Sequence, residues 1–419
     1  MPIPNAANIN STGVLIAASG LTSIQLSTSR ESVTIGPGNR WGDIYEYLEP
    51  YDLIVVGGRL GVVGVPGFML GGGISFFGNQ YGWASSNVIS YECVLASGQI
   101  INATSSNEYS DLFWALRGGG NSFCLVTAFE LKTYEKSSLY LGDTSYGTDI
   151  SEEFLDHVYH FAHNGSQDNK AAVIPLVNWY SYAPTSLSFS AMRFYDGNDS
   201  TPAAFTNFTA PVMTPTSDTF HRRSMYDWVS EFDIEFALAE GLRQRFYVLS
   251  LPADRLAMGI IHDTYFETIK NLSNSTGFVI AGVAYMPISE SYIRSGIELA
   301  GQDPMGVDPS KAPYIWVEQS LTWTSTADDA AVIAFIKRVN NLIKIKLDAI
   351  NFDSSPYLYL NDANSDQKVF EGYPDCNVQK LKQIRAKYDS QNIFTDLMPG
   401  GWKVEHTVSG LDTTVGCAE

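Results

Sequence analysis

Short apolar runs separated by turn residues fill the first third of the chain. Such runs are typical of β-strands, and the Gly, Pro, Asn and Ser residues between them are typical of turns. The predicted strands are "GVLIAAS", "SIQLS", "SVTIGPG", "LIVVGG" and "VISYECVLASGQIINA", the last folded into a hairpin at its central Ser-Gly. Two helices are predicted among them, in "GDIYEYLEP" and in "SDLFWALRGGG", where three glycines end the helix before a further strand. Residues 1–132 therefore predict one α+β unit.

A different pattern runs from residue 133 to residue 350. Longer segments with alternating apolar positions predict strands in "AAVIPLVNWYSYA", "SLSFSAMRFY", "GFVIAGVAYMPI" and "YIWVEQSLTWT". Amphipathic spacing predicts helices, as in "DDAAVIAFIKRVNNLIKIKL". An antiparallel sheet backed by helices fits this second domain best. Residues 351–404 predict a strand, a helix and a turn, and residues 405–419 a tail.

Composition limits the function classes. The chain has 419 residues, 45% of them apolar, and a net charge of −19 without clustered Lys and Arg, which argues against nucleic acid as a partner. No apolar run is long enough to span a bilayer, so no membrane partner is expected, and the start lacks the pattern of a signal peptide. Seven sequons nevertheless favour a secreted glycoprotein, at Asn10, Asn102, Asn164, Asn198, Asn207, Asn271 and Asn274. The four cysteines predict at most one disulfide and favour buried thiols.

Two glycine clusters, Gly64 to Gly73 and Gly118 to Gly120, carry the strongest chemical signal. Consecutive backbone N–H groups in such turns form nests for phosphate oxygens, which would let an acidic protein hold a pyrophosphate. The alternative is a tight strand crossing without a ligand. No GxGxxG, Walker loop, GxSxG or HExxH motif occurs.

The stretch from "SVTIGPGNRWGDIYEYLEP" through "VGVPGFMLGGGISFFGNQYGWASSNV" to "DLFWALRGGGNSFCLVTAFEL" resembles the PCMH-type FAD-binding domain of the vanillyl-alcohol-oxidase superfamily, in its berberine-bridge-enzyme-like branch. Fungal FAD-linked oxidoreductases, many tied to secondary metabolism, are the most similar members. "YLYLNDAN" and "KYDSQNIFTDLMPGGWKV" are similar to the segment by which this family returns to its flavin domain. The resemblance implies FAD, with the glycine-rich stretch along its pyrophosphate and ribityl chain.

The resemblance also implies site residues. Positions that line the cofactor in family members are occupied here by Gly64, Gly67, Gly71, Gly72, Gly73, Asn87, Val88 and Val126. Tyr359 and Asn361 correspond to a Tyr and an Asn near the isoalloxazine ring. Tyr359 would then be a catalytic proton acceptor, and the alternative is that it is one aromatic in a half-buried strand.

Several positions depart from the family pattern. Leu60 stands where some members attach FAD through cysteine, Asp362 follows Asn361 where an aromatic is usual, and Cys124 replaces a glycine. Related enzymes also have an N-terminal portion with a second pyrophosphate loop and often a flavin-linked histidine. We therefore expect a domain incomplete at its N-terminus, a truncated sequence rather than a natural short form, and weak, non-covalent FAD binding. All six histidines follow the glycine clusters, at His157, His160, His163, His221, His262 and His406.

The predicted function is flavin-dependent oxidation of an alcohol, amine or related small organic substrate, with molecular oxygen as a candidate electron acceptor. Trp179, Tyr180, Tyr182 and Tyr285 would cover the ring, although core packing is an equally common role for such aromatics. Glu318 and the pair Arg222–Arg223 stay open. Histidines 157, 160 and 163 are interpreted as a solvated helix face, and no metal site is expected. The alternative function is a catalytically silent relative that binds a ligand or partner.

Overall fold

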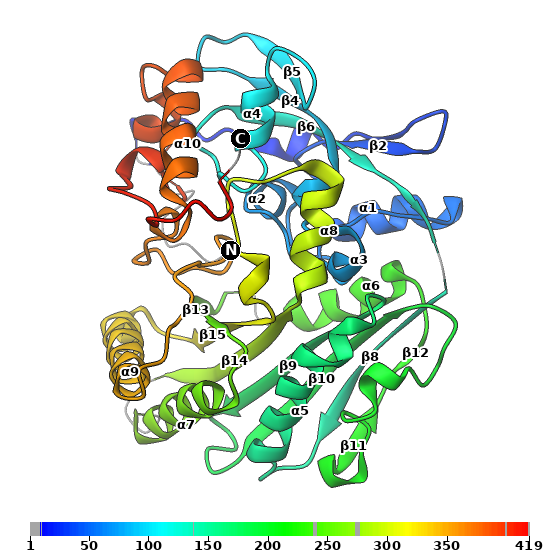
Figure 1. Ribbon diagram of the computed structural model, residues 1–419, viewed down its shortest axis with the longest axis vertical. Helices are drawn as coiled ribbons and strands as arrows, with labels where there is room; N and C mark the ends of the chain where they lie inside the picture. The colour runs from blue at the N-terminus through cyan, green and yellow to red at the C-terminus, as the bar shows by residue number, and fades with distance from the viewer. Residues whose placement is uncertain are drawn as a thin grey trace.

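The computed structural model describes residues 9, 11–136, 138–237, 241–272, 277–398 and 400–417. Its first sheet has five antiparallel strands in the order β1-β2-β6-β4-β5 (Figure 1). These strands are β1 Ile24–Leu26, β2 Ser32–Ile35, β4 Val88–Val94, β5 Ile100–Thr104 and β6 Leu125–Lys132. The predicted hairpin is confirmed, because β4 and β5 pair around Gly98, whose φ of +82° suits glycine.

Helices pack around this sheet: α1 Trp41–Leu48, α2 Val65–Leu70, α3 Gly78–Tyr81, α4 Ser110–Ala115 and the late α10 Asp375–Tyr388. The predicted helix in "GDIYEYLEP" is α1, which buries Trp41, Ile44, Tyr45 and Leu48 along one face. A small two-stranded ladder pairs β3 Leu53–Ile54 with β7 Tyr134–Glu135.

The second sheet has eight strands, ordered β11-β8-β10-β9-β14-β15-β13, with β12 also paired to β8. All of its pairings are antiparallel, as predicted. The strands are β8 Leu139–Tyr146, β9 Ala171–Tyr180, β10 Leu187–Asp196, β11 Pro215–Asp218, β12 His221–Arg222, β13 Arg243–Pro252, β14 Phe278–Ile288 and β15 Tyr314–Trp323.

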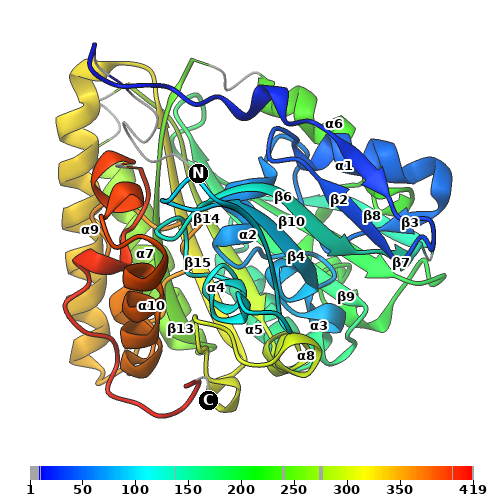
Figure 2. The same ribbon diagram turned by 90° about the horizontal axis from the view of Figure 1, so that it is seen from above.

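Alternation along these strands divides the second sheet into two faces. One face packs on α5 Ser151–His163, α7 Arg255–Leu272 and α9 Asp329–Ala349 and forms a separate apolar core. The other face joins the core of the first domain, so the two sheets meet across one interior (Figure 1). Two further helices, α6 Met225–Ala237 beside α1 and α8 Glu290–Ala300 against α3, also connect the domains (Figure 2). None of the described helices is long and apolar enough to cross a membrane.

Two predicted strands are wrong. "GVLIAAS" forms no strand, and Val14, Leu15 and Ile16 are exposed, because no strand pairs with them among the described residues. "YLYLND" is an extended segment outside both sheets, with only an isolated bridge between Ser355 and Ser250 nearby. The prediction of at most one disulfide is confirmed, since Cys376 and Cys417 form one, whereas the preference for buried thiols holds only for Cys93 and Cys124.

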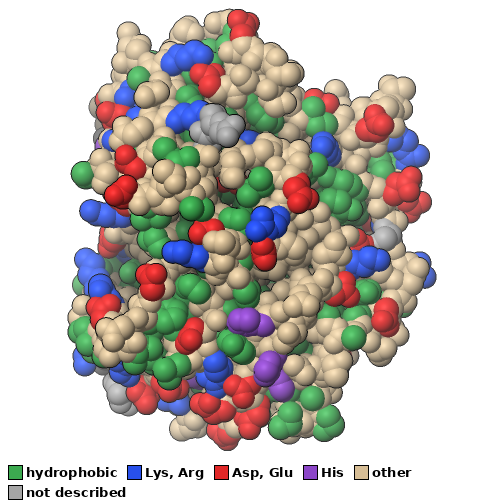
Figure 3. All heavy atoms as spheres, viewed as in Figure 1, with side chains coloured by type: hydrophobic (Ala, Val, Ile, Leu, Met, Phe, Trp, Pro, Cys, Tyr) green, Lys and Arg blue, Asp and Glu red, His purple; other side chains and the backbone are tan. Residues whose placement is uncertain are grey.

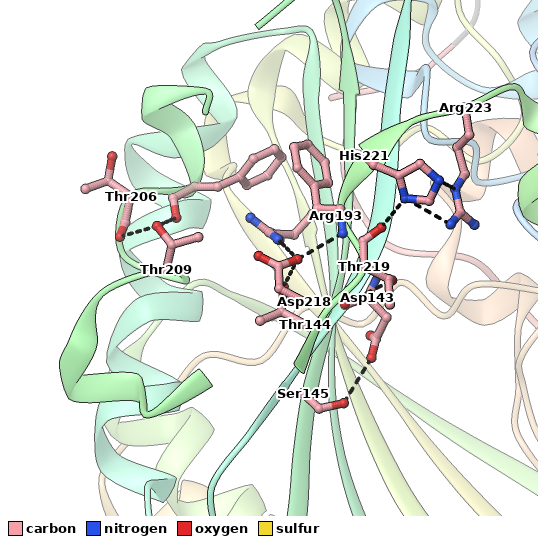
Figure 4. Close-up of polar contacts among 12 residues, drawn as sticks. Asp143, Thr144, Ser145, Arg193, Thr206, Thr209, Asp218, Thr219, His221 and Arg223 are labelled. Carbon is pink, nitrogen blue, oxygen red and sulfur yellow. Dashed lines mark hydrogen bonds and ion pairs between the residues drawn. The ribbon is translucent and has the colours of Figure 1, made fainter. Parts of the chain in front are cut away.

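A buried cation fixes the outer strands of the second sheet. Arg193 of β10 is 3% exposed and pairs with Asp218 of β11 at 2.5 Å, while its guanidinium lies over the ring of Phe220 at 4.4 Å (Figure 4). Asp218 also accepts the backbone N–H of Phe220 at 2.9 Å. The cluster ties the β11–β12 connection to the sheet.

Candidate active site

The open part of the glycine-rich stretch lies at the start of α2. Gly64 and Gly67 are both exposed. A Cβ added at Gly67 would meet no atom within 4 Å, and one at Gly64 would meet only Pro66 at 4.0 Å. Gly64 also pairs through its backbone with Arg40, whose side chain is exposed. This uncovered backbone edge beside a cation suits phosphate groups, so the residues present fit the pyrophosphate of FAD.

The rest of the two glycine clusters packs against protein. A Cβ at Gly71 would lie 2.2 Å from Asn361 Oδ1, and one at Gly72 or Gly118 would lie 2.8 Å from an atom of Met305. Several of their amides are also occupied, because Gly71 and Gly72 donate to carbonyls of α2 and Gly120 donates to Leu70. A phosphate nest at Gly71, Gly72 and Gly73 stays a prediction. These glycines fit the alternative, a tight crossing of the chain without a ligand, in which the Met305 side chain lies between the two clusters.

Tyr359 and Asn361 close over the end of this stretch. The Tyr359 hydroxyl accepts the N–H of Ile74 at 3.0 Å and the Asn361 side-chain amide at 2.9 Å. Asn361 Nδ2 also donates to the carbonyl of Phe68 at 3.0 Å. Burial, followed by the nearby Asp362 carboxylate, raises the pKa of Tyr359. A phenol with a raised pKa is a poor proton acceptor, so this arrangement favours a positioning role for Tyr359.

An aromatic cluster that the sequence did not indicate surrounds Tyr359. The Trp316 ring of β15 stacks on Trp83, with centroids 5.4 Å apart, and on Tyr359 at 5.7 Å. Its Nε1 is buried without a hydrogen-bond partner among the described residues. Trp83 and Trp316 therefore join the glycine-rich stretch to the second sheet.

Glu318 is the charged residue of β15 and lies on the face toward the first domain. It is opposite Val248 of β13 and Ala284 of β14 and is half-buried. Burial, followed by the Asp362 carboxylate, raises the pKa of Glu318 to about 8, and Arg59 opposes the shift. Burial also raises the pKa of Asp362 to about 6, again opposed by Arg59. The two carboxyl groups therefore retain a proton near neutral pH.

Tertiary structure brings this acid pair together. Asn364 donates to the carbonyl of Phe246 at 2.6 Å, and Gln367 accepts the N–H of Val248 at 3.0 Å, so the segment after Asp362 follows the free edge of β13. Arg59 reaches the same sheet face, where its guanidinium lies 3.3 Å from Met286 Sδ. Sequence reasoning left Glu318 open, interpreted Asp362 only as a missing aromatic and overlooked Arg59. The one signal available in the sequence was the charge of Glu318 within the otherwise uncharged strand "YIWVEQSLTW".

The remaining predicted cofactor residues lie apart. Asn87 locks a turn by donating to the carbonyl of Trp83 at 2.8 Å and accepting the Tyr134 hydroxyl at 2.6 Å. Val88 pairs with Leu131 at one end of the β4–β6 ladder, whereas Val126 pairs with Cys93 near the other end, so the structure does not bring the two valines together. Their contact with FAD stays a prediction.

Two of the four aromatics expected over the flavin ring have instead the core-packing role that was given as the alternative. Trp179 and Tyr285 are fully buried in the core on the opposite face of the second sheet, and Tyr182 is 81% exposed. The histidines of α5 were predicted to form a solvated helix face. His160 is exposed as predicted, whereas His157 is half-buried. Leu60 is half-buried, and among the described residues no group of three metal-binding side chains occurs.

Comparison with known proteins agrees with this geometry. A family model described as an FAD binding domain matches residues 4–104. The FAD-dependent monooxygenase tpcD of Cochliobolus heterostrophus is 32% identical, with 96% of this chain and 78% of that protein covered. The bifunctional solanapyrone synthase of Alternaria solani is 30% identical over 96% of this chain and 75% of that protein.

Solved structures show the same fold at low identity. The 6-hydroxy-D-nicotine oxidase of Arthrobacter nicotinovorans superposes with a TM-score of 0.71 at 19% identity, covering 89% of this chain and 79% of that one. The berberine bridge enzyme of Eschscholzia californica gives a TM-score of 0.71 at 16% identity, covering 94% and 80%.

The fold and site thus define an FAD-linked oxidoreductase with a PCMH-type flavin domain and a large antiparallel sheet backed by helices. The chain belongs to the berberine-bridge-enzyme-like family of FAD-linked oxidoreductases.

Proposed function

We propose that the protein oxidises an alcohol, amine or related small organic molecule, and that Glu318 accepts the proton of the substrate hydroxyl or amine. The observation that carries this proposal is the acid pair of Glu318 and Asp362 with Arg59, on the sheet face beside Tyr359. When bound, FAD supplies the two-electron oxidant that takes hydride from the substrate carbon.

The environment of Glu318 suits a general base at mildly alkaline pH, where the carboxyl group has lost its proton. Burial raises the pKa of Glu318 to about 8, which places it near the operating pH where proton transfer is most effective. The negative charge of Asp362 favours the protonated form of Glu318, so the transferred proton is held on Glu318. The Arg59 guanidinium favours the ionised forms of both acids. Tyr359 holds the backbone of Ile74 and thereby the glycine-rich stretch.

Gly64, Gly67 and Arg40 would hold the phosphates of FAD, and the attachment is proposed to be non-covalent. No cysteine is available at Leu60, and the described histidines lie on the second domain and the C-terminal segment. Asn361 and Tyr359 stay the proposed residues near the flavin ring.

A polar notch beside Glu318 supports an oxygen-bearing substrate. Asn178 of β9, Gly282 of β14 and Ser320 of β15 are neighbours in register, on the face toward the first domain. A Cβ at Gly282 would lie 2.4 Å from Asn178 Oδ1 and 2.8 Å from Ser320 Oγ, so only glycine fits between these two polar side chains. These groups would bind a hydroxyl or carbonyl remote from the oxidised carbon.

The test is anaerobic bleaching of the flavin. The protein, purified with FAD, is mixed without oxygen with alcohols, sugars, amines and polyketide-like compounds, and flavin absorbance is recorded. The proposal predicts bleaching by at least one class, and readmitted oxygen separates an oxidase from a dehydrogenase by the speed of reoxidation. If no compound reduces the bound flavin, the ligand-binding alternative replaces the proposal.

A further inference from the structure

We propose that a groove on the far side of the second sheet binds an anionic amphiphile, a molecule with one carboxylate and a hydrocarbon chain or ring system. The groove lies between β13, α9 and the segment 352–368 and has a volume of about 700 Å³. Pockets that hold small organic ligands measure about 300–1,000 Å³. Nothing in the proposed oxidation uses this groove.

The floor of the groove is apolar and needs no further hydrogen bonds. Its apolar lining consists of Tyr247, Leu249, Ile333, Ile336, Ile343, Leu347, Phe352 and Leu358. The amides of Asn340 and Gln319 bond to each other twice at 2.9 Å, and Asn340 also donates to the carbonyl of Ile336. A hydrocarbon chain can therefore cover this floor without leaving these polar groups unpaired.

The charge of the groove has the opposite sign to that of the protein. Four basic and two acidic side chains line it, a net charge of +2, whereas the whole chain carries −19. Both acids are already paired: Lys344 contacts Asp348 at 2.6 Å, and Arg245 and Lys337 share Asp366 at 3.5 and 3.8 Å. The excess positive charge therefore favours an anionic head group.

The basic side chains of α9 that line the groove lie on one face of the helix. Lys337 and Lys344 are seven residues apart, which is two helical turns, whereas Lys346 lies about 200° around the axis from Lys344. Lys346 is exposed and does not line the groove. Figure 3 shows hydrophobic side chains over the α9 side of the molecule, with basic and acidic side chains among them. The helix thus offers a matched control for a charge test.

An occupant of the groove would touch the segment that carries the active-site residues. Leu358 lines the groove, and the next residue, Tyr359, faces the glycine-rich stretch on the other side. Gln367 also lines the groove and bonds both backbone groups of Val248, the residue opposite Glu318. A ligand that contacts Leu358 in the groove therefore lies one residue along the chain from Tyr359 of the candidate active site.

The test is calorimetric titration of the FAD-loaded protein with decanoate and, separately, with decyltrimethylammonium, both below their micelle concentrations. The proposal predicts saturable decanoate binding, at least about tenfold tighter than binding of the cationic probe. The double variant Lys337→Gln/Lys344→Gln should weaken decanoate binding at least about fivefold, while Lys346→Gln changes it less than about twofold.

Circular dichroism of each variant checks that the fold is kept. A second variant, Leu358→Asp, removes apolar lining and adds a negative charge, and it should also weaken decanoate binding. Absence of saturable decanoate binding, equal affinity for both probes, or equal losses in the groove and control variants would overturn the proposal. None of these outcomes depends on whether the protein oxidises a substrate.

Discussion

Replacing Glu318 by Gln should change how the stability of the protein depends on pH. Burial and the Asp362 carboxylate raise the pKa of Glu318 in the folded chain to about 8, from an ordinary value of 4.5. Below pH 4.5 this carboxyl group is protonated in both the folded and the unfolded chain, and its contribution to the free energy of unfolding is fully present. The contribution is lost as pH rises from 4.5 through about 8, because the unfolded chain then ionises more readily than the folded one. The glutamine side chain never ionises. The variant should therefore gain stability relative to wild type as pH increases.

The size of this effect follows from the same pKa values. Moving the pKa of one carboxyl from 4.5 to about 8 corresponds to at most about 5 kcal/mol. Glu318 is only half-buried, so water screens part of that cost, and about 2 kcal/mol is expected between pH 5 and pH 9. Asp362 lies in the same cluster, so Asp362→Asn should give a smaller change of the same sign.

Urea unfolding at pH 5 and pH 9, at constant ionic strength and followed by fluorescence, measures the difference. Glu298→Gln on the exposed side of α8 is the control, and it should track wild type at both pH values. If the difference between Glu318→Gln and wild type is the same at both pH values, the pKa of Glu318 is not raised. A relative gain of wild type at pH 9 would reverse the sign of the argument.

Three further predictions concern the rest of the molecule. Arg193→Met removes the cation that pairs with the exposed Asp218 and should lower the free energy of unfolding by about 1–2 kcal/mol, measured by urea unfolding against the exposed control Arg294→Met. The proposed non-covalent attachment predicts that acid precipitation leaves the flavin colour in the supernatant, and a yellow pellet would refute it. An N-glycosidase should reduce the mass of the natively produced protein, since a disulfide is typical of secreted proteins and three sequons of the second domain, Asn164, Asn198 and Asn207, are exposed.

Much of the fold could be predicted from local sequence signals. Alternation of apolar residues correctly predicted β9, β10, β14 and β15, and the Ser-Gly turn correctly predicted the β4–β5 hairpin. The failures at "GVLIAAS" and "YLYLND" have a common cause. A strand needs a partner with free backbone groups, and an apolar pattern does not show whether one is present. Ser355 makes only an isolated bridge, because side chains of Asn364 and Gln367 take up the edge of β13.

The candidate site was harder to predict because it depends on contacts between distant residues. Glu318 and Asp362 are 44 positions apart, and only the path of the return segment along β13 brings their charges together. The glycines gave the opposite problem: their pattern indicated phosphate nests, but three of them, Gly71, Gly72 and Gly118, make room for Asn361 or Met305. A glycine's need for space can be predicted from the sequence, whereas what fills that space depends on tertiary packing.

The central claim is that Glu318 accepts the substrate proton during oxidation. The most direct test is stopped-flow measurement of anaerobic flavin reduction, using a substrate found in the panel, as a function of pH. The claim predicts a rate that rises with pH toward a plateau with an apparent pKa near 8. It also predicts that Glu318→Gln slows reduction by at least about 100-fold while Glu298→Gln does not. Reduction by Glu318→Gln at the wild-type rate, with an unchanged pH profile, would contradict it.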